Sequence, residues 1–254
     1  MQSLKERLLT PGREPIVGLF CSTPTPLTVE LIAAAGYDFA VIDLEHTLID
    51  GALLGAMLLA ARASGIAPLV RVAALHQVAP ALDAGAQGIV FPRITSAAQV
   101  SEAVACCHHT CGIPTGKRGL NATWHSGYGR DDLREATEDA ARHTLVVAMI
   151  EDAAGLRNAD DIAAQRGVDV LLEGAADLSQ SLGVPWQTRH PHVRDAVETI
   201  AAAAQRHDKH FCALPRTPDD AAAWRARGTR MMVLGDDRGI ARRAMAAHRQ
   251  ACIV

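Results

Sequence analysis

Eight short apolar segments recur along this 254-residue sequence, separated by stretches that are typical of helices. They cover Ile16–Phe20, Phe39–Asp43, Ala67–Arg71, Gly88–Phe91, Leu145–Ile150, Val168–Leu172, His210–Ala213 and Met231–Leu234. Because they are apolar throughout rather than alternating, both faces of each predicted strand should be covered, as in a parallel sheet wrapped by helices. Eight strand–helix units indicate an α/β fold of the (β/α)8 (TIM) barrel type.

The segments between the predicted strands carry helix boundary signals. Thr25-Pro26 precedes an expected helix over Leu27–Ala35, and Thr217-Pro218 opens another that closes near Gly228. The competing fold is an open, doubly wound sheet, which needs a glycine-rich phosphate loop after its first strand. Residues 18–24 supply no such loop, so we expect one barrel domain over residues 1–254.

Composition excludes several classes of protein. A formal net charge of -3 with interspersed charges leaves no basic stripe, so we expect no nucleic-acid partner. The N-terminal residues lack a signal-peptide pattern and no stretch approaches eighteen unbroken apolar residues, which predicts a cytoplasmic protein without a membrane partner. Six cysteines in such a chain are expected to be reduced thiols.

Two segments break the regular pattern. The stretch 112–130 is much longer than the usual connection of about 2–6 residues, and it could line the active site, reach a neighbouring subunit or be mobile. The cluster Cys106–Cys111 contains cysteines and histidines, but its spacing resembles no ordinary zinc pattern. We expect it to form a helix end with one or two buried thiols and exposed histidines.

Polar residues stand where the predicted strands end, and in parallel α/β folds this end of the sheet carries the active site. Glu151 and Asp177 follow two consecutive strands, so in a barrel they would be neighbours. Two carboxylates without nearby sulfur form a hard-oxygen site suited to Mg²⁺ or Mn²⁺, and a divalent metal chelated by a 2-oxo acid would stabilise an enolate. The alternative is a pair of solvated carboxylates.

Two further strand ends carry basic side chains. Arg71 closes the third strand and could hold a substrate carboxylate or an enolate oxygen, or else form a salt bridge with Asp43 or Glu45. His46 follows Asp43, and a histidine oriented by a carboxylate is a common general base near neutral pH. We therefore expect His46, Arg71 and Asp43 to form the catalytic group.

Several motifs of the chain resemble the HpcH/HpaI aldolase family of metal-dependent C–C lyases. The similarity covers nearly the whole sequence and rests on segments 36–46, 68–72, 82–92, 116–119, 150–151 and 174–183. The resemblance implies a (β/α)8 barrel whose last helix is exchanged between partners, in dimers that assemble into hexamers. It also implies an enzyme that acts on a small 2-oxo acid, pyruvate or oxaloacetate, through an enolate.

The same resemblance assigns roles to the strand-end residues. It implies that Glu151 and Asp177 hold a divalent metal, Mg²⁺ first and Mn²⁺ or Co²⁺ as alternatives. Arg71 would steady the oxo-acid oxygen, and His46 paired with Asp43 would transfer protons. The substrate carboxylate would lie against the backbone of Gly174, Ala175 and Ala176, with Leu214 in the pocket wall.

The chain departs from the aldolase pattern beside this site. Met149 stands where family aldolases usually have Gln, and Gly174-Ala175-Ala176 replaces Gly-Pro-Ala. These departures, with Asp43–Thr47, resemble a branch of the family that condenses oxaloacetate with acetyl-CoA to citrate for staphyloferrin-type siderophores. The sequence leaves two hypotheses open, an aldolase and a citrate synthase, and a barrel that binds an acid without catalysis is a weaker third.

Overall fold

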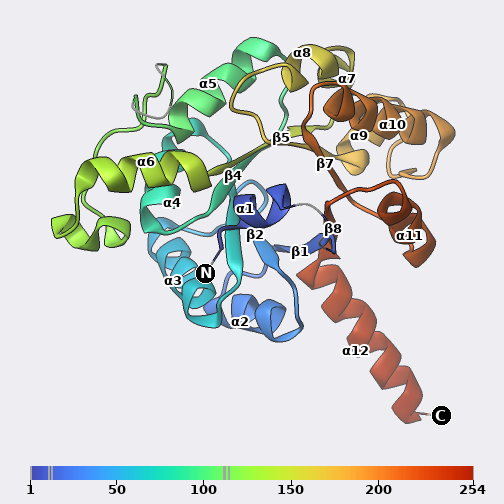
Figure 1. Cartoon of the computed structure of the whole chain (residues 1–254). Helices are drawn as coiled ribbons and strands as arrows, with labels where there is room; N and C mark the ends of the chain where they lie inside the picture. Colours follow the sequence, from blue (N-terminus) through green and yellow to red (C-terminus); the bar gives the residue numbers. More distant parts are fainter. Residues whose placement is uncertain (1, 11, 13, 111–112, 114, 254) are drawn as a thin grey trace.

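The computed structural model describes residues 2–10, 12, 14–110, 113 and 115–253 of the chain. Eight parallel strands close into a barrel in which each strand pairs with its neighbour in sequence and β8 pairs with β1 (Figure 1). Their bounds are β1 Ile16–Cys21, β2 Phe39–Asp43, β3 Ala67–Arg71, β4 Gly88–Phe91, β5 Leu145–Ile150, β6 Val170–Glu173, β7 His210–Ala213 and β8 Met231–Asp236. The predicted barrel is therefore confirmed; β6 is displaced by one or two residues from its expected bounds.

Helices surround the barrel and join successive strands (Figure 1). They are α1 Leu4–Leu9, α2 Pro26–Ala34, α3 Gly51–Ser64, α4 Val78–Ala84, α5 Ala97–Cys107, α6 Leu133–His143, α7 Ala153–Arg157, α8 Ala159–Ala163, α9 Ala175–Ser181, α10 Pro191–Arg206, α11 Pro218–Ala226 and α12 Asp237–Ile253, with 3₁₀ turns η1 Leu75–Gln77 and η2 Trp124–Gly129. One apolar core lies between this layer and the strands, and a second fills the barrel interior.

The barrel interior is packed with large side chains, and one glycine makes room for the largest of them. A Cβ atom on Gly18 of β1 would lie 2.3 Å from the ring of Phe39 on β2. Phe39 is fully buried at that point. Any larger residue at position 18 would displace the ring, so this glycine serves close packing rather than phosphate binding.

Helix α1 lies across the N-terminal end of the barrel (Figure 1). Leu4 and Leu8 are buried in the interior core, and the N–H of Leu4 donates to Gln87 Oε1 at 2.8 Å. Lys5 Nζ lies 2.8 Å from Asp169 Oδ1, while Asp169 also accepts the N–H of Val146 at 2.8 Å. The floor of the barrel is thus sealed by apolar contacts and paired charges.

The segment between α5 and β5 differs from part of its prediction. Helix α5 ends at Cys107 with a buried thiol, as expected, but His108 and His109 are buried rather than exposed. The chain folds back over them, since the N–H of Arg118 donates to the His108 carbonyl and His109 Nδ1 lies 3.0 Å from the Arg118 carbonyl. Cys111 and residues 112 and 114 of the long loop lie outside the described residues.

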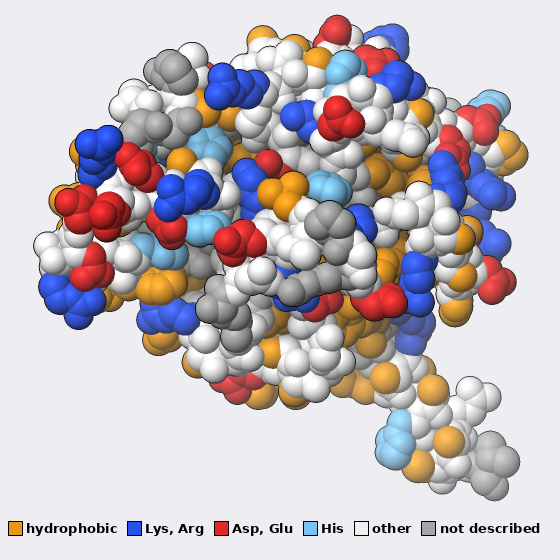
Figure 2. Space-filling view, viewed as in Figure 1, with side chains coloured by type: hydrophobic (Ala, Val, Ile, Leu, Met, Phe, Trp, Pro, Cys, Tyr) orange, Lys and Arg blue, Asp and Glu red, His pale blue; other side chains and the backbone are white. Residues whose placement is uncertain are grey.

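Helix α12 projects away from the barrel at the C-terminal end of the chain (Figure 1). It has no buried residue over its described length, and Met245 and Ile253 are 70% and 64% exposed. The space-filling view shows hydrophobic side chains on this projection, whereas charges of both signs are mixed over the body of the molecule (Figure 2). Among the described helices, none has the length and apolar character to cross a membrane.

Candidate active site

Asp43 and Arg71 form a buried ion pair at the C-terminal end of the barrel. They are register partners at the ends of the adjacent strands β2 and β3. Arg71 Nε donates to Asp43 Oδ1 and Nη2 donates to Oδ2, both at 2.8 Å, and the guanidinium lies 4.7 Å from the centre of the Phe20 ring. Burial opposes the charge of Asp43, but the hydrogen bonds and charge of Arg71 hold its pKa below the ordinary value.

In this arrangement no hydrogen bond joins His46 to Asp43 among the described residues. Both Asp43 oxygens accept hydrogen bonds from Arg71, and Oδ1 also accepts the N–H of Glu45 at 3.0 Å. The imidazole of His46 is half exposed, and its Nε2 lies 3.6 Å from Glu45 Oε2. The carboxylate within ion-pair distance of His46 is that of Glu45, while Asp43, the predicted partner, interacts with His46 through its charge.

Glu151 and Asp177 lie on the opposite side of the C-terminal opening of the barrel, which we call the mouth. Glu151 directly follows β5, and Asp177 lies in the first turn of α9. Glu151 is 3% exposed and accepts the N–H of Arg93 at 2.7 Å, whereas Asp177 is exposed. Burial, aided by the nearby carboxylates of Glu45 and Asp177, raises the pKa of Glu151 to about 7, against the opposing effects of the Arg93 N–H hydrogen bond and of the Arg71 charge. The fold thus brings the two carboxylates together, as expected of consecutive strands.

The segment predicted to receive a substrate carboxylate lies directly against Glu151. A Cβ atom on Gly174 would lie 2.4 Å from Glu151 Cβ, so only glycine fits there. The N–H of Gly174 donates to Ile150 and that of Ala175 donates to Glu173 Oε2 at 3.0 Å. Of the three backbone N–H groups predicted to bind the substrate carboxylate, these bonds therefore leave only that of Ala176 available.

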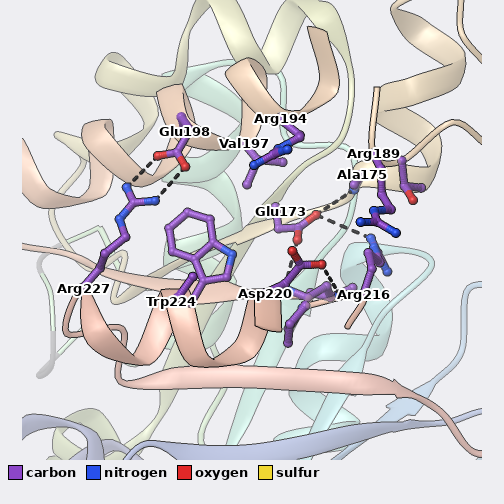
Figure 3. Close-up of a pocket in the computed structure, with 14 residues that line it drawn as sticks. Glu173, Ala175, Arg189, Arg194, Val197, Glu198, Arg216, Asp220, Trp224 and Arg227 are labelled. Atoms are coloured by element: carbon purple, nitrogen blue, oxygen red, sulfur yellow. Dashed lines mark hydrogen bonds and ion pairs between the residues drawn. The ribbon is translucent and has the colours of Figure 1, made fainter. Parts of the chain in front are cut away.

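Glu173 and Leu214 join this segment to the next strand. Glu173 is the last residue of β6, it is 3% exposed, and its Oε1 accepts the N–H of Leu214 at 2.9 Å. Burial raises the pKa of this carboxyl, while the charge of Arg216 and the two backbone hydrogen bonds lower it. Figure 3 shows Glu173 between Ala175 and Arg216. Its bonds fix the backbone on which the predicted contacts of Ala175 and Leu214 depend.

Three residues of the mouth were absent from the predicted site. Glu45 lies within ion-pair distance of Arg71, Arg93 and His46, and Arg93 follows β4 with a left-handed φ of 53°. Glu173 ends β6. Each stands at or just beyond a strand end, so the rule that selected Glu151 also points to them.

The mouth carries a surplus of carboxylate charge. The carboxylates of Glu45 and Asp177 are close enough to the buried Glu151 to raise its pKa. Glu45 Oε2 is itself buried without a hydrogen bond, although Arg71 Nη1 lies 3.4 Å from it. Carboxylate oxygens are hard donors, and their negative charge is not fully compensated here. Such a site suits a small divalent cation. Within the described residues no three His, Cys, Asp or Glu side chains form a ready chelating group, so substrate and water would supply the other ligands.

A barrel mouth with an anchored arginine and a carboxylate pair that can hold a divalent cation suits enzymes that form or cleave C–C bonds next to a carbonyl. Comparison with known proteins gives the same class. The family model for HpcH/HpaI aldolase/citrate lyase matches residues 17–244, and the chain belongs to this family. It is therefore an enzyme of the aldolase and lyase type, as predicted.

Individual relatives include both kinds of enzyme that the sequence left open. A 5-keto-4-deoxy-D-glucarate aldolase of Klebsiella pneumoniae is 30% identical over 90% of this chain and 88% of its own length. The crystal structure of the citrate synthase SbnG is 43% identical with a TM-score of 0.90, covering 98% of this chain and 97% of that one. A family member from Burkholderia cenocepacia is 32% identical with a TM-score of 0.91, covering 99% of both chains.

Proposed function

We propose that this enzyme condenses oxaloacetate with the acetyl group of acetyl-CoA to form citrate and free CoA. The observation that carries this proposal is the 43% identity with the citrate synthase SbnG along essentially the whole chain. The arrangement of Arg71, Glu151 and Asp177 at the mouth supports it. The departures at Met149 and Ala175 lie against the carboxylate site, where the acceptor must fit. The product would suit a carboxylate siderophore of the staphyloferrin B type, made in the cytoplasm.

A divalent metal, Mg²⁺ before Mn²⁺ or Co²⁺, belongs to this proposal. Glu151 and Asp177 would hold it, and the neighbouring carboxylates of Glu45 and Asp177, which help to raise the pKa of the buried Glu151, support a cation at this place. When bound, the metal supplies Lewis-acid stabilisation of the oxygen charge that develops at the carbonyl of the oxo acid.

The protein's own residues position the substrate and move protons. Asp43 takes two donors of Arg71 and thereby fixes the guanidinium, whose Nη1 stays on the side of Glu45 and the mouth. Arg71 would bind the oxo-acid oxygens, and the first turn of α9 at Ala176 would bind a carboxylate. His46, beside Glu45, would remove a proton from the acetyl methyl group; attack on the oxaloacetate carbonyl and hydrolysis of the thioester then release citrate and CoA.

The test is to incubate the enzyme with oxaloacetate and acetyl-CoA and to measure free thiol and citrate together. We expect both in equal amounts, dependent on a divalent metal and abolished by chelation. A wild-type enzyme that releases no thiol at any loading of Mg²⁺, Mn²⁺ or Co²⁺ would overturn the proposal.

An aldolase acting on pyruvate is the second candidate, favoured by the 30% identity with the Klebsiella pneumoniae aldolase over nine-tenths of the chain. It needs the same anchored Arg71 and carboxylate pair, but an aldehyde as acceptor. Exchange of the pyruvate methyl protons with deuterated water, dependent on metal, would support it. Rapid exchange without thiol release from acetyl-CoA would select the aldolase over the citrate synthase.

The projecting helix α12 supports a further part of the proposal, a homo-oligomer with exchanged C-terminal helices. Met245 and Ile253 are exposed on it, and Leu27 and Leu31 are 57% and 60% exposed on α2. Apolar residues of this kind are usually covered, and a second copy of the chain would cover both sets. Sedimentation of the full chain should then show a dimer or hexamer; a monomer at micromolar concentration would refute it.

A further inference from the structure

A cavity lies beside the mouth, between α10 and α11 (Figure 3). It measures about 210 Å³ and is built from the segments that follow β6 and β7, which belong to the catalytic face of the barrel. Its wall includes Ala175 and Leu214, and Ala175 follows the glycine that lies against Glu151. The cavity is therefore next to the reacting centre but outside the barrel.

The cavity is lined by four arginines, and two of them have no acidic partner. Arg227 forms two hydrogen bonds of 2.6 Å with Glu198, and Arg216 lies 3.6 Å from Glu173. Arg189 and Arg194 also line the cavity, yet within the described part of the chain neither side chain forms a hydrogen bond or an ion pair. Two guanidinium groups are thus free to bind an anion.

The other walls of the cavity are preorganised. The oxygens of Glu173 are occupied by the N–H groups of Ala175 and Leu214, so this buried carboxylate acts as a brace. The Trp224 ring lies between the Arg227–Glu198 pair and the end of the cavity where Arg189 and Arg216 stand (Figure 3). Arg227 covers one face of that ring at 4.2 Å, which leaves a rigid, partly apolar wall.

The size and charge of the cavity suit one anionic group of a larger ligand. Pockets that enclose a whole small ligand usually measure about 300–1,000 Å³, so 210 Å³ suits one anionic group and its immediate attachment. Arginine pairs favour phosphate and carboxylate oxygens, which accept two parallel hydrogen bonds. Of the two substrates in the proposed function, the thioester carries phosphates at a distance from its reacting end.

We propose that this arginine-lined cavity, with Arg189 and Arg194 as its free cations, binds a phosphate group of acetyl-CoA while the acetyl end enters the mouth past Ala175 and Leu214. The inference rests on the proposed citrate synthase activity. It adds a binding site to that activity, and it assigns α10 and α11 a role in selecting the thioester over a free acid.

Calorimetric titration with CoA tests the site without requiring turnover. The double variant Arg189→Ala/Arg194→Ala should bind CoA about tenfold more weakly than wild type, because it loses two exposed charge-assisted contacts. Arg225→Ala is the matched control, since Arg225 is an exposed arginine of α11 that does not line the cavity. It should leave the CoA affinity within about twofold of wild type.

Kinetics then separate this site from the proposed reaction. The double variant should raise KM for acetyl-CoA by about the same tenfold, with kcat and KM for oxaloacetate unchanged. A wild type that forms citrate, with a double variant of unaltered KM, would overturn the phosphate site and keep the function. Binding of CoA that depends on both arginines, without thiol release in wild type, would keep the site and overturn the function.

A polycarboxylate is the competing occupant. If citrate alone binds in a manner that depends on Arg189 and Arg194, while CoA affinity is the same in wild type and the double variant, the cavity is a carboxylate site and the phosphate assignment is wrong. Melting temperatures of all variants provide the control for folding, and both arginines are exposed, so no loss is expected.

Discussion

The two ends of the barrel differ in how the charges of their carboxylates are compensated. At the floor, Asp169 lies between Lys5 and the N–H of Val146, and Asp38 receives Arg7 and the N–H of Val17. At the mouth, Glu151 is buried near other carboxylates and its pKa rises to about 7. Charges at the floor are compensated within the chain and stabilise the fold, whereas the mouth retains a deficit of positive charge that a metal would fill.

The mouth also contains one buried ion pair in which both charges are compensated, that of Asp43 with Arg71. Breaking this pair should have the largest effect on stability and activity. Arg71→Ala leaves a buried carboxylate without its partner, which costs about 3–5 kcal/mol of unfolding free energy. It also removes the donor for the oxo acid, so activity should be lost. Urea denaturation and thiol release measure the two effects.

The double variant Asp43→Asn/Arg71→Ala separates these contributions. It removes the buried charge along with its partner and should recover part of the stability but none of the activity. Equal losses of stability in the single and double variants would show that the pair does not behave as a buried charge.

Glu151→Gln should have the next largest effect, with stability and activity changing in opposite directions. The folded pKa of about 7 lies above the ordinary 4.5, so the folded state binds more protons and wild type loses stability as pH rises through this range. Without metal at pH 8 the glutamine variant should be more stable by about 2–3 kcal/mol, and at pH 4 the difference should vanish. A variant that is less stable at pH 8 would contradict this account of the mouth.

How far the two ends follow from the sequence depends on where the partners of each residue come from. Apolar runs identified the strands, and strand ends identified Arg71, Glu151 and Asp177, because both signals are local. Asp43 and Arg71 are also register partners, so the salt bridge left open as an alternative to substrate binding is a direct result of adjacent strands.

Other features depended on distant backbone. Glu173 accepts a hydrogen bond from the N–H of Leu214, which follows the next strand, β7. His108 is covered where the chain folds back at Arg118 over the end of α5. No local pattern encodes such contacts. The pairing of His46 with Glu45 rather than Asp43 has a similar cause, since both Asp43 oxygens are already occupied by Arg71.

Metal affinity should show a smaller effect that depends on pH. A proton and a divalent cation compete for Glu151, so the Kd for Mn²⁺ should rise by about tenfold per pH unit as pH falls below 7 and become constant above pH 8. Calorimetric titration of the metal-free enzyme between pH 5.5 and 8.5 measures this. A constant Kd over the whole range would show that Glu151 does not bind the metal as a carboxylate.

The smallest effect is expected at the floor, from Lys5→Met. Methionine keeps the apolar stem but removes the charge that lies 2.8 Å from Asp169, whose side chain is 18% exposed and retains the N–H of Val146. Unfolding free energy should therefore fall by about 1 kcal/mol or less, with kcat and both KM values unchanged. Denaturation and steady-state kinetics on the same preparation check both statements. Because the floor lies at the opposite end of the strands from the reacting groups, a loss of kcat at unchanged stability would mean that the two ends are coupled through the barrel interior and that the division between a stabilising floor and a catalytic mouth is wrong.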